Sequence, residues 1–567
     1  MNHRLHGPTL ILATGAFLLA SHFWGGAALA QGTPDQRAGR VDALFADLNR
    51  TPSPGLAVAV VRDGRVLLRK GYGLASIEHR VPVTPSTVFD IASASKQFTG
   101  LAVAMLVSEG KIKLSDDIRT YLPELPDMGR PITVDHLLHH TSGIRDWPGT
   151  LLVGGWRFDD VISFNQLLTM AYNQRDLMFL PGAEYSYSNT GYNLLAEMVR
   201  RVTGRSFRTW TDEQLFRPLG MLDTHFRDDY TEVIANRAFG YARAPDGSYH
   251  HMPNNLTALG SSSLFSTVDD LARWMINFDE AAVGGRAAMS LTRTRGTLND
   301  GTTTDYAFGL IHRDHRGLPM LFHDGAWAGF NSLLVYFPQQ KFGIVVLANG
   351  SSVNAGDAVN KIAEIYLEKE LAPAEPVPVA TPAAGPTAAV PPAVLGGYVG
   401  LYRLGPGSYV RVRLEGATLT AEATREKPVT ISPKSEQEFW AGRDGAQIVF
   451  RRDAAGKVEY LEYRGRRASK VDESGPPQPA QMGEYAGDYE SEELGTLYRV
   501  ALKDGALEMQ HRRHGTIPLT RLWRDDFGSP VAFMISVEFQ RDREGRVLGL
   551  VVNGNPRSRN IRFLKRR

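Results

Sequence analysis

The pattern of apolar and polar residues divides the chain at about residue 370. Before that point, strand-like apolar runs alternate with segments of helical periodicity. The apolar run at 56–61 is followed by Asp63-Gly64 and a second apolar run, which predicts a β-hairpin. Two more buried strands are expected at 333–337 and 343–347. Strands at both ends with helices between them predict an α+β domain, an antiparallel sheet flanked by helices.

Beyond residue 370 the pattern changes. Residues 371–395 are mainly Ala, Pro, Val and Thr, which predicts an extended linker. After it, short alternating runs separated by Gly and Asp turns form an internal repeat, in which Tyr398 and Tyr402 recur 87 positions later as Tyr485 and Tyr489. Each unit has room for about eight short strands. We therefore expect two small closed antiparallel β-barrels, at 396–475 and 482–567, with these tyrosines in their cores.

The first thirty residues have the pattern of a secretory signal peptide. Arg4 precedes an apolar run at 10–20, and the small residues Ala28 and Ala30 precede Gln31. The apolar run is short for a membrane span, and no other stretch reaches eighteen apolar residues. We therefore expect a signal peptide at 1–30, a first domain at 31–370, a periplasmic or secreted location, and no transmembrane span in the mature form.

Composition narrows the possible chemistry. The net charge of +2 gives no argument for a nucleic-acid partner, and the absence of cysteine excludes disulfides and thiol catalysis. Three histidines lie within residues 136–140, of which His136 and His140 have the i, i+4 spacing of a helical pair of ligands, but no Glu stands at position 137 and no third ligand is evident. The sequence therefore predicts neither a metal nor an organic cofactor.

Ser93 and Lys96 are the strongest candidates for catalysis. They stand three residues apart at the start of a predicted helix at 97–109, so both side chains lie on one face, about one turn apart. A lysine in this position can activate a serine hydroxyl as a nucleophile. The same spacing at Ser108 and Lys111 falls at the predicted end of that helix, so we exclude it.

Two other segments supply polar groups that acyl transfer needs. Tyr187 and Asn189 form the only Tyr-x-Asn, between a Pro-Gly turn and a predicted helix at 193–202. The tyrosine can relay a proton, and the amide can hold the lysine or a substrate amide. His323 ends an apolar run and is expected to point inward, and Gly325 lets a substrate lie against the backbone.

With these motifs, the chain resembles the serine β-lactamase and penicillin-binding-protein superfamily, nearest its class C, D,D-peptidase and esterase branch. The segments at 140–143, 218–221 and 266–271 add to the resemblance. It implies an acyl-enzyme on Ser93, with Lys96 or Tyr187 as the base and Asn189 as an orienting group. It also implies an oxyanion site made by the N–H groups of Ser93 and Ala326.

His323 stands where β-lactamases and D,D-carboxypeptidases usually have a lysine. An imidazole is mostly neutral at pH 7, which weakens the case for substrates with a free carboxylate at this subsite. The substitution and the two C-terminal barrels resemble the D-aminopeptidase group, in which the barrels are lipocalin-like and a loop of the last barrel shapes the active site. The segment 524–528 is one example of a second-barrel loop that could lie near Ser93.

The expected function is therefore that of a peptidase acting on peptides that contain D-amino acids or derive from peptidoglycan. A carboxylesterase and a β-lactamase with the same residues are the alternatives within the superfamily. A non-catalytic penicillin-recognising or ligand-binding protein is the alternative of another class. For the barrels, covering the cleft, forming a homodimer and binding cell wall are all compatible with the sequence.

Overall fold

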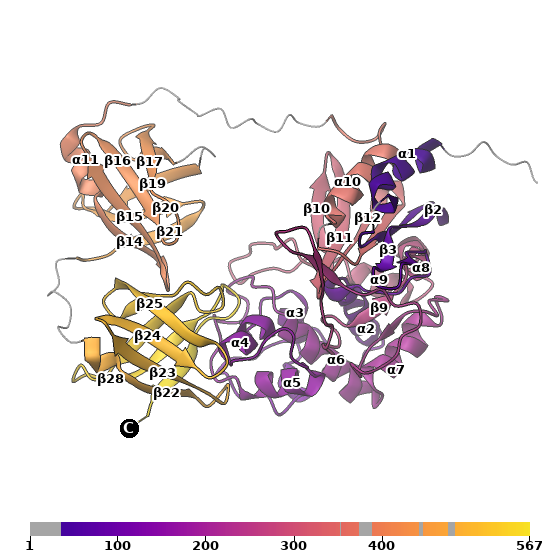
Figure 1. The fold of residues 1–567 in the computed structure, drawn as a ribbon, viewed down its shortest axis with the longest axis horizontal. Coiled ribbons are helices and arrows are strands. Elements are labelled where there is room, and N and C mark those ends of the chain that lie inside the picture. The colour runs from indigo at the N-terminus through magenta and orange to yellow at the C-terminus, as the bar shows by residue number, and fades with distance from the viewer. Residues whose placement is uncertain are drawn as a thin grey trace, which may run out of the picture.

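The computed structural model describes residues 36–50, 52–351, 353–373, 388–441, 446–473 and 482–566. The expected signal peptide and residues 374–387 of the expected linker lie outside these ranges. Figure 1 shows an N-terminal domain followed by two barrels, of which the second lies against the N-terminal domain. No helix within the described ranges has both the length and the apolar character needed to cross a membrane.

A six-stranded antiparallel sheet forms the centre of the N-terminal domain, in the order β10-β11-β12-β13-β1-β2. Strand β1 pairs with β13, so the two ends of this domain meet in the sheet. The predicted hairpin and the two later strands are confirmed. The strands are β1 (Leu56–Arg62), β2 (Arg65–Tyr72), β10 (Ile311–His315), β11 (Leu318–Trp327), β12 (Phe330–Phe337) and β13 (Phe342–Ala348).

Both faces of this sheet are covered by helices. Leu56, Val58 and Val60 of β1 pack into a core with the helices on one face, while the residues between them pack into the core on the other face. A strand buried on both faces is apolar at every position, which explains the uninterrupted apolar run. The α+β prediction is confirmed. The covering helices are α1 (Gln36–Phe45) and α10 (Ala355–Tyr366) on one face, and α2 (Lys96–Ser108) and α8 (Val268–Glu280) on the other.

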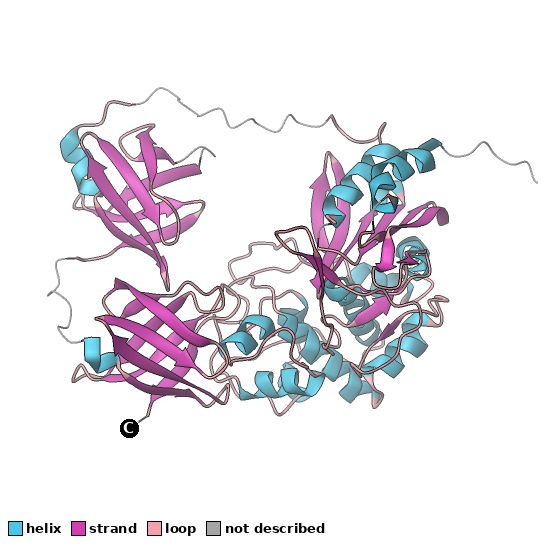
Figure 2. Cartoon of the chain, viewed as in Figure 1, coloured by secondary structure: helices cyan, strands magenta, loops and turns pink. Residues whose placement is uncertain are grey.

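The chain between β2 and β10 forms a mainly helical lobe, which lies next to the second barrel (Figure 2). Its other α-helices are α3 (Val134–Leu138), α4 (Trp147–Val153), α5 (Phe164–Asn173), α6 (Asn189–Thr203), α7 (Phe207–Thr211) and α9 (Gly285–Leu291). Short strands complete it: β3 (Leu74–Ser76), β4 (Val81–Pro82), β5 (Phe89–Asp90), β6 (His225–Phe226), β7 (Tyr241–Arg243), β8 (Tyr249–His251) and β9 (Leu264–Ser266).

Each C-terminal unit is a closed antiparallel barrel of eight strands, as predicted. The four repeat tyrosines at 398, 402, 485 and 489 are fully buried in the barrel cores. The first barrel contains β14 (Gly400–Gly405), β15 (Ser408–Glu415), β16 (Thr418–Ala423), β17 (Val429–Pro433), β18 (Glu438–Ala441), β19 (Ala446–Arg452), β20 (Val458–Tyr463) and β21 (Arg466–Lys470). The second contains β22 (Gly487–Ser491), β23 (Thr496–Lys503), β24 (Ala506–His511), β25 (Gly515–Trp523), β26 (Asp526–Gly528), β27 (Ser536–Arg541), β28 (Val547–Asn553) and β29 (Ile561–Lys565).

The internal repeat is also visible in the details of the barrels. In each barrel, the second repeat tyrosine donates a hydrogen bond of 2.7 Å to the backbone carbonyl of the first. Gly400 and Gly487 hold φ values of +148° and +149°, where a β-carbon would meet the side chain of Lys470 or Lys565. Helix α11 (Pro392–Tyr398) leads into the first barrel and begins inside the segment that the sequence assigns to the linker.

The second barrel is docked on the C-terminal end of helix α4. The side chain of Val153 is buried in the barrel core. The Val153 carbonyl accepts a hydrogen bond from the Tyr498 hydroxyl at 3.0 Å, and the Leu152 carbonyl lies 2.7 Å from Nε2 of His514. The barrel therefore supplies a partner for the Val153 carbonyl, at the helix end where backbone carbonyls have no partner within the helix.

A buried ion pair strengthens this docking. The fully buried guanidinium of Arg145 lies 2.5 Å from the Glu493 carboxylate of the barrel. Arg145 also donates hydrogen bonds to the backbone carbonyls of Arg559 and Asn560, each at 2.6 Å. The ion pair thus joins the barrel to Arg145. The next residue, Asp146, belongs to the site described below.

The first barrel rests on the second one. The Tyr409 hydroxyl donates to the Asp526 carboxylate at 2.7 Å, and the Gly407 N–H donates to the same carboxylate at 3.2 Å. The segment 524–528 therefore contacts the first barrel. The suggestion that this segment approaches Ser93 is wrong. The connection of the second barrel that lines the pocket around Ser93 is the one between β28 and β29.

Replacing Glu493 by Ala tests the docking. The substitution leaves the Arg145 charge buried without its carboxylate, so we expect a loss of about 3–5 kcal/mol in the free energy of unfolding from urea titrations. Arg562→Ala is the control across the same interface, because the Arg562–Asp176 pair (2.9 Å) is largely exposed and should cost less than about 1 kcal/mol. Equal losses in the two variants would show that the Arg145–Glu493 pair does not hold the barrel.

Candidate active site

Ser93 lies in a short 3-10 turn, Ala92–Ser95, which leads into helix α2. Ala92 has a φ of +49°, a strained value for a residue with a side chain. Two hydrogen bonds hold the turn: the Ala92 N–H donates to Oδ1 of Asp90 at 2.8 Å, and the Ser332 hydroxyl donates to the carbonyl of Ile91 at 2.6 Å. The nucleophile candidate is therefore fixed from both sides.

Gly325 lets strand β11 approach this turn closely. A β-carbon at position 325 would lie 2.2 Å from the Ile91 carbonyl oxygen and 2.9 Å from the Ser93 nitrogen. No side chain larger than hydrogen fits there unless the strand moves away. Ser93 and Ala326, the two expected oxyanion donors, line the same pocket because of this approach.

Lys96 is fully buried directly beneath Ser93. Its Nζ lies 3.1 Å from Oγ of Ser93, 2.7 Å from Oδ1 of Asn189 and 2.7 Å from the carbonyl oxygen of Ser261. Burial lowers the pKa of Lys96 to about 7. A neutral amine can give its two hydrogens to Asn189 and Ser261, which leaves its lone pair for the Ser93 hydroxyl.

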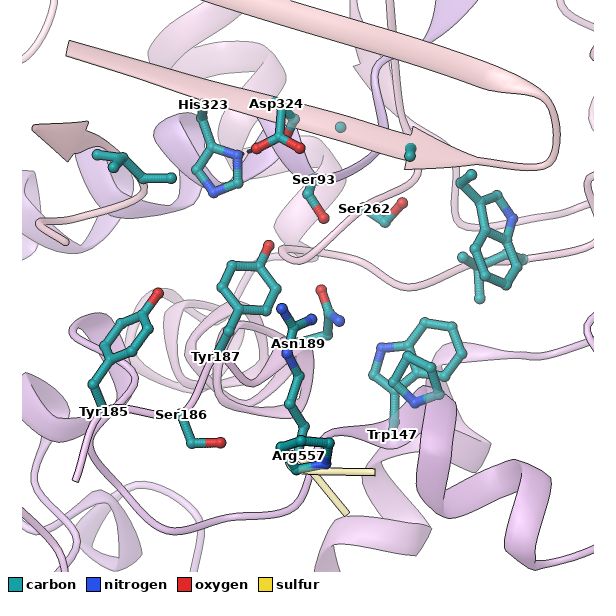
Figure 3. A pocket seen from close by; sticks show the side chains of 17 residues that line it. Ser93, Trp147, Tyr185, Ser186, Tyr187, Asn189, Ser262, His323, Asp324 and Arg557 are labelled. Atoms are coloured by element: carbon teal, nitrogen blue, oxygen red, sulfur yellow. Dashed lines mark hydrogen bonds between the residues drawn. The ribbon is translucent and has the colours of Figure 1, made fainter. Parts of the chain in front are cut away.

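Tyr187 lies on the other side of the nucleophile. In Figure 3 its phenol points toward the Ser93 hydroxyl, and its ring centroid is 4.8 Å from Nζ of Lys96. Burial raises the pKa of Tyr187 well above its usual value, so the phenol keeps its proton at neutral pH. His140 packs against the same ring with its centroid 4.3 Å away, and its Nδ1 accepts a hydrogen bond from the Ser188 N–H.

His323 is neutral in this environment. Its Nδ1 lies 2.6 Å from the carbonyl oxygen of Asp324, and its Nε2 lies 3.0 Å from the Tyr306 hydroxyl. Because a carbonyl can only accept, Nδ1 carries the hydrogen and Tyr306 donates to Nε2. Burial, with the nearby Lys96, lowers the pKa of His323 to about 4. No fixed positive charge is therefore present where the superfamily usually has lysine.

Asp146 is a site residue that the sequence analysis missed. Asn189 is the first residue of α6, which begins four positions before the predicted helix because Ser188 caps it. The backbone N–H and the Nδ2 of Asn189 both donate to Oδ1 of Asp146, at 2.8 and 2.9 Å. This fixes the amide with its oxygen toward Lys96. Asp146 lies three residues after the segment 140–143, which is part of the resemblance to the superfamily. This position close to a matching segment is the feature of the sequence that could have identified Asp146.

Arg557 was missed too, and it comes from the second barrel. The carbonyl of Arg557 accepts a hydrogen bond from the Asp146 N–H at 2.8 Å, and the guanidinium carbon lies 4.8 Å from the Tyr187 ring centroid. Figure 3 shows Arg557 below Tyr187 and Asn189, on the opposite side of them from His323. It lies on the β28–β29 connection, which spans 554–560, whereas the equivalent β20–β21 turn has only residues 464–465. Phe450 and its equivalent in the second repeat are 89 positions apart, whereas Lys470 and its equivalent are 95 positions apart. This change in the repeat offset is the feature of the sequence that indicates the longer connection.

The pocket around Ser93 has a volume of about 600 Å³. Trp147 and Trp327 form an aromatic wall, with their ring centroids 5.7 Å apart, and Tyr185 lies at the other side (Figure 3). The structure thus brings together all seven residues that the sequence analysis selected: Ser93, Lys96, Tyr187, Asn189, His323, Gly325 and Ala326. Within the described ranges, no group of three or more His, Asp or Glu side chains is arranged to hold a metal ion.

Comparison with protein families matches residues 41–367 to the family described as Beta-lactamase. The match covers more than half of the chain. The chain belongs to the beta-lactamase family. Among curated proteins, this beta-lactamase-family chain is 30% identical to the D-aminopeptidase of Gluconobacter oxydans (strain 621H) over 319 residues, which cover 56% of the chain and 60% of that enzyme.

A second relative covers more of the chain. Penicillin-binding protein 4* of Bacillus subtilis (strain 168) is 26% identical over 431 residues, 72% of this chain and 93% of the relative. Among solved structures, the octameric penicillin-binding protein homologue from Pyrococcus abyssi aligns with a TM-score of 0.54 over 84% of this chain and 99% of that one, at 21% identity. The solved structure supports the fold of this beta-lactamase-family chain.

Replacing Gly325 by Ala tests the close approach of β11 to the Ser93 turn. The new methyl group forces the strand away from Ile91 and Ser93, so we expect acylation of Ser93 to slow by about 100-fold, the usual cost of misplacing a reacting group by about 1 Å. The acylation rate is measured from intact-mass spectra, as the increase with time in the fraction of protein that carries the acyl group. Gly396→Ala is the control, since a β-carbon there meets no atom within 4 Å. Unchanged acylation in Gly325→Ala would contradict this role.

Proposed function

We propose that this protein is a serine hydrolase that forms an acyl-enzyme on Ser93 and acts on short peptides or amides containing D-amino acids. The observation that carries the proposal is the Lys96 amine, which is desolvated, has a pKa of about 7 and lies 3.1 Å from Oγ of Ser93. A base whose pKa is near the working pH is the most effective kind.

In the acylation step, neutral Lys96 accepts the proton of the Ser93 hydroxyl while Oγ attacks the substrate carbonyl. The negative charge that develops on the carbonyl oxygen is stabilised by the N–H groups of Ser93 and Ala326. Lys96 is favoured over Tyr187 as the base, because the same burial that makes a neutral amine available disfavours a phenolate.

In the second half of acylation, the tetrahedral intermediate collapses and its C–N bond breaks. Tyr187 gives its phenolic proton to the leaving amine, and the Lys96 ammonium then gives its proton to the resulting Tyr187 phenolate, so that both side chains are neutral again. A water molecule then adds to the acyl-enzyme as Lys96 takes its proton, and Ser93 regains a hydrogen when the acid product leaves. Asn189, fixed by Asp146, keeps the lysine in place throughout.

The preference for D-amino-acid substrates rests on two observations. One is the similarity to a D-aminopeptidase, which covers 60% of that enzyme. The other is the neutral His323, which the sequence analysis connected with the same group. Export through residues 1–30 and a homodimer stay predictions of the sequence.

Labelling with a fluorophosphonate probe tests the nucleophile. We expect intact mass to show one phosphonyl group on the wild-type protein and none on Ser93→Ala, because only an activated hydroxyl reacts with such probes. Ser108→Ala is the matched control, since it removes the serine of the second Ser-x-x-Lys and should label like the wild type. A label that persists on Ser93→Ala would refute the proposed nucleophile.

Turnover then separates the substrate classes. D-alanine p-nitroanilide should be hydrolysed by the wild type and by Ser108→Ala, and the L-enantiomer at a much lower rate. Faster hydrolysis of p-nitrophenyl acetate with no activity on the D-anilide would replace the peptidase by a carboxylesterase. Fast hydrolysis of a cephalosporin alone would replace it by a β-lactamase.

A further inference from the structure

Two residues of opposite formal charge, Asp324 and Arg557, are among the described residues that line the active-site pocket. Asp324 belongs to β11, next to the neutral His323, whereas Arg557 comes from the second barrel. In Figure 3 the two lie on opposite sides of Ser93 and Tyr187. The pocket therefore has a negative end along the strand and a positive end at the barrel.

The Arg557 guanidinium has unused hydrogen-bonding capacity. Its nearest carboxylate oxygen is Oδ2 of Asp146 at 3.9 Å, and the Asp146 carboxylate already accepts three hydrogen bonds from Asn189. Across the residues that the structure describes, the guanidinium donates no hydrogen bond to a protein acceptor, and the side chain is 52% exposed. By contrast, Arg559 on the same connection lies 2.9 Å from Glu184.

The guanidinium is also held in place for a ligand. One side of it lies over the Tyr187 ring, and the Arg557 backbone is fixed by its hydrogen bond with the Asp146 N–H. The planar fork of an arginine matches the two oxygens of a carboxylate, and a preorganised fork loses little entropy on binding. Arg557 and Ser93 line the same pocket of about 600 Å³, so an anion at Arg557 and a reacting carbonyl at Ser93 fit one short peptide.

We propose that Arg557 binds a carboxylate of the substrate, so that the enzyme prefers short peptides with a free C-terminal carboxylate on the barrel side of Ser93. This inference rests on the proposed hydrolase function. It assigns to a residue of the second barrel the fixed positive charge that His323 does not supply. Asp324 at the opposite end disfavours the reverse orientation of the substrate, because it would repel the carboxylate.

Two substrates that differ only in this charge test the proposal: the dipeptide D-Ala-D-Ala and its C-terminal amide. Cleavage of the bond between the two residues is followed by mass spectrometry of the products. We expect the wild type to favour the free acid. In Arg557→Gln, KM for the free acid should rise by about 10- to 100-fold, the cost of losing a charge-assisted hydrogen bond, while KM for the amide changes by less than about threefold.

Two further variants make the result specific. Arg559→Gln removes a neighbouring arginine that faces Glu184, and it should leave the preference for the free acid unchanged. Arg557→Lys keeps the charge without the fork and should retain part of the preference. An equal loss on both substrates in Arg557→Gln would overturn the proposal, since the arginine would then act on the catalytic groups. A wild type without preference for the free acid would overturn it as well.

The assay also distinguishes this inference from the function on which it rests. Hydrolysis of neutral D-alanine p-nitroanilide requires Ser93 but no substrate carboxylate. If the wild type hydrolyses the anilide and shows no carboxylate preference, only the role of Arg557 is refuted. If it hydrolyses neither anilide nor dipeptide and Ser93 takes up no probe, the hydrolase function itself is refuted.

Discussion

The burial of one amine, that of Lys96, is the constraint on which the site depends. Removing an ammonium from water is costly unless the group loses its proton or gains partners. Here Asn189 and Ser261 supply two acceptors, and the third contact is the Ser93 hydroxyl. The desolvation that would destabilise a charged lysine thus favours a neutral amine beside the Ser93 hydroxyl, and the proposed mechanism uses this amine as the base. The enclosed Tyr187, which keeps its proton, complements it as an acid.

The rest of the fold keeps that amine in its environment. The Ser93 turn is held against β11 by Gly325, and Asn189 is held by Asp146. Asp146 in turn lies between the buried Arg145 and the helix α4 on which the second barrel is docked. The barrel is therefore part of the wall of the site, and its Arg557 changes the charge that a substrate meets.

The sequence predicted what depends on local patterns. The hairpin at β1 and β2, the eight-stranded barrels and the one-turn spacing of Ser93 and Lys96 follow from alternation, turn residues and helical geometry. It did not predict Asp146 or Arg557, because their roles arise from contacts between residues far apart along the chain, Asp146 with Asn189 and Arg557 with Tyr187. The longer β28–β29 connection was visible as a change in the repeat offset, but nothing local indicates where it points. The segment 524–528, chosen instead, faces the first barrel.

The ionisation of Lys96 is the most direct test of this account. An NMR titration of the protein with ¹³C-labelled lysine, with the Lys96 signal assigned through Lys96→Met, reports the protonation of this amine between pH 5 and 11. The account predicts a midpoint at about 7 for Lys96, well below the usual pKa of about 10.4 for a lysine side chain in water. A Lys96 midpoint among those of the exposed lysines would show that the amine is charged at neutral pH, and would contradict its role as the base.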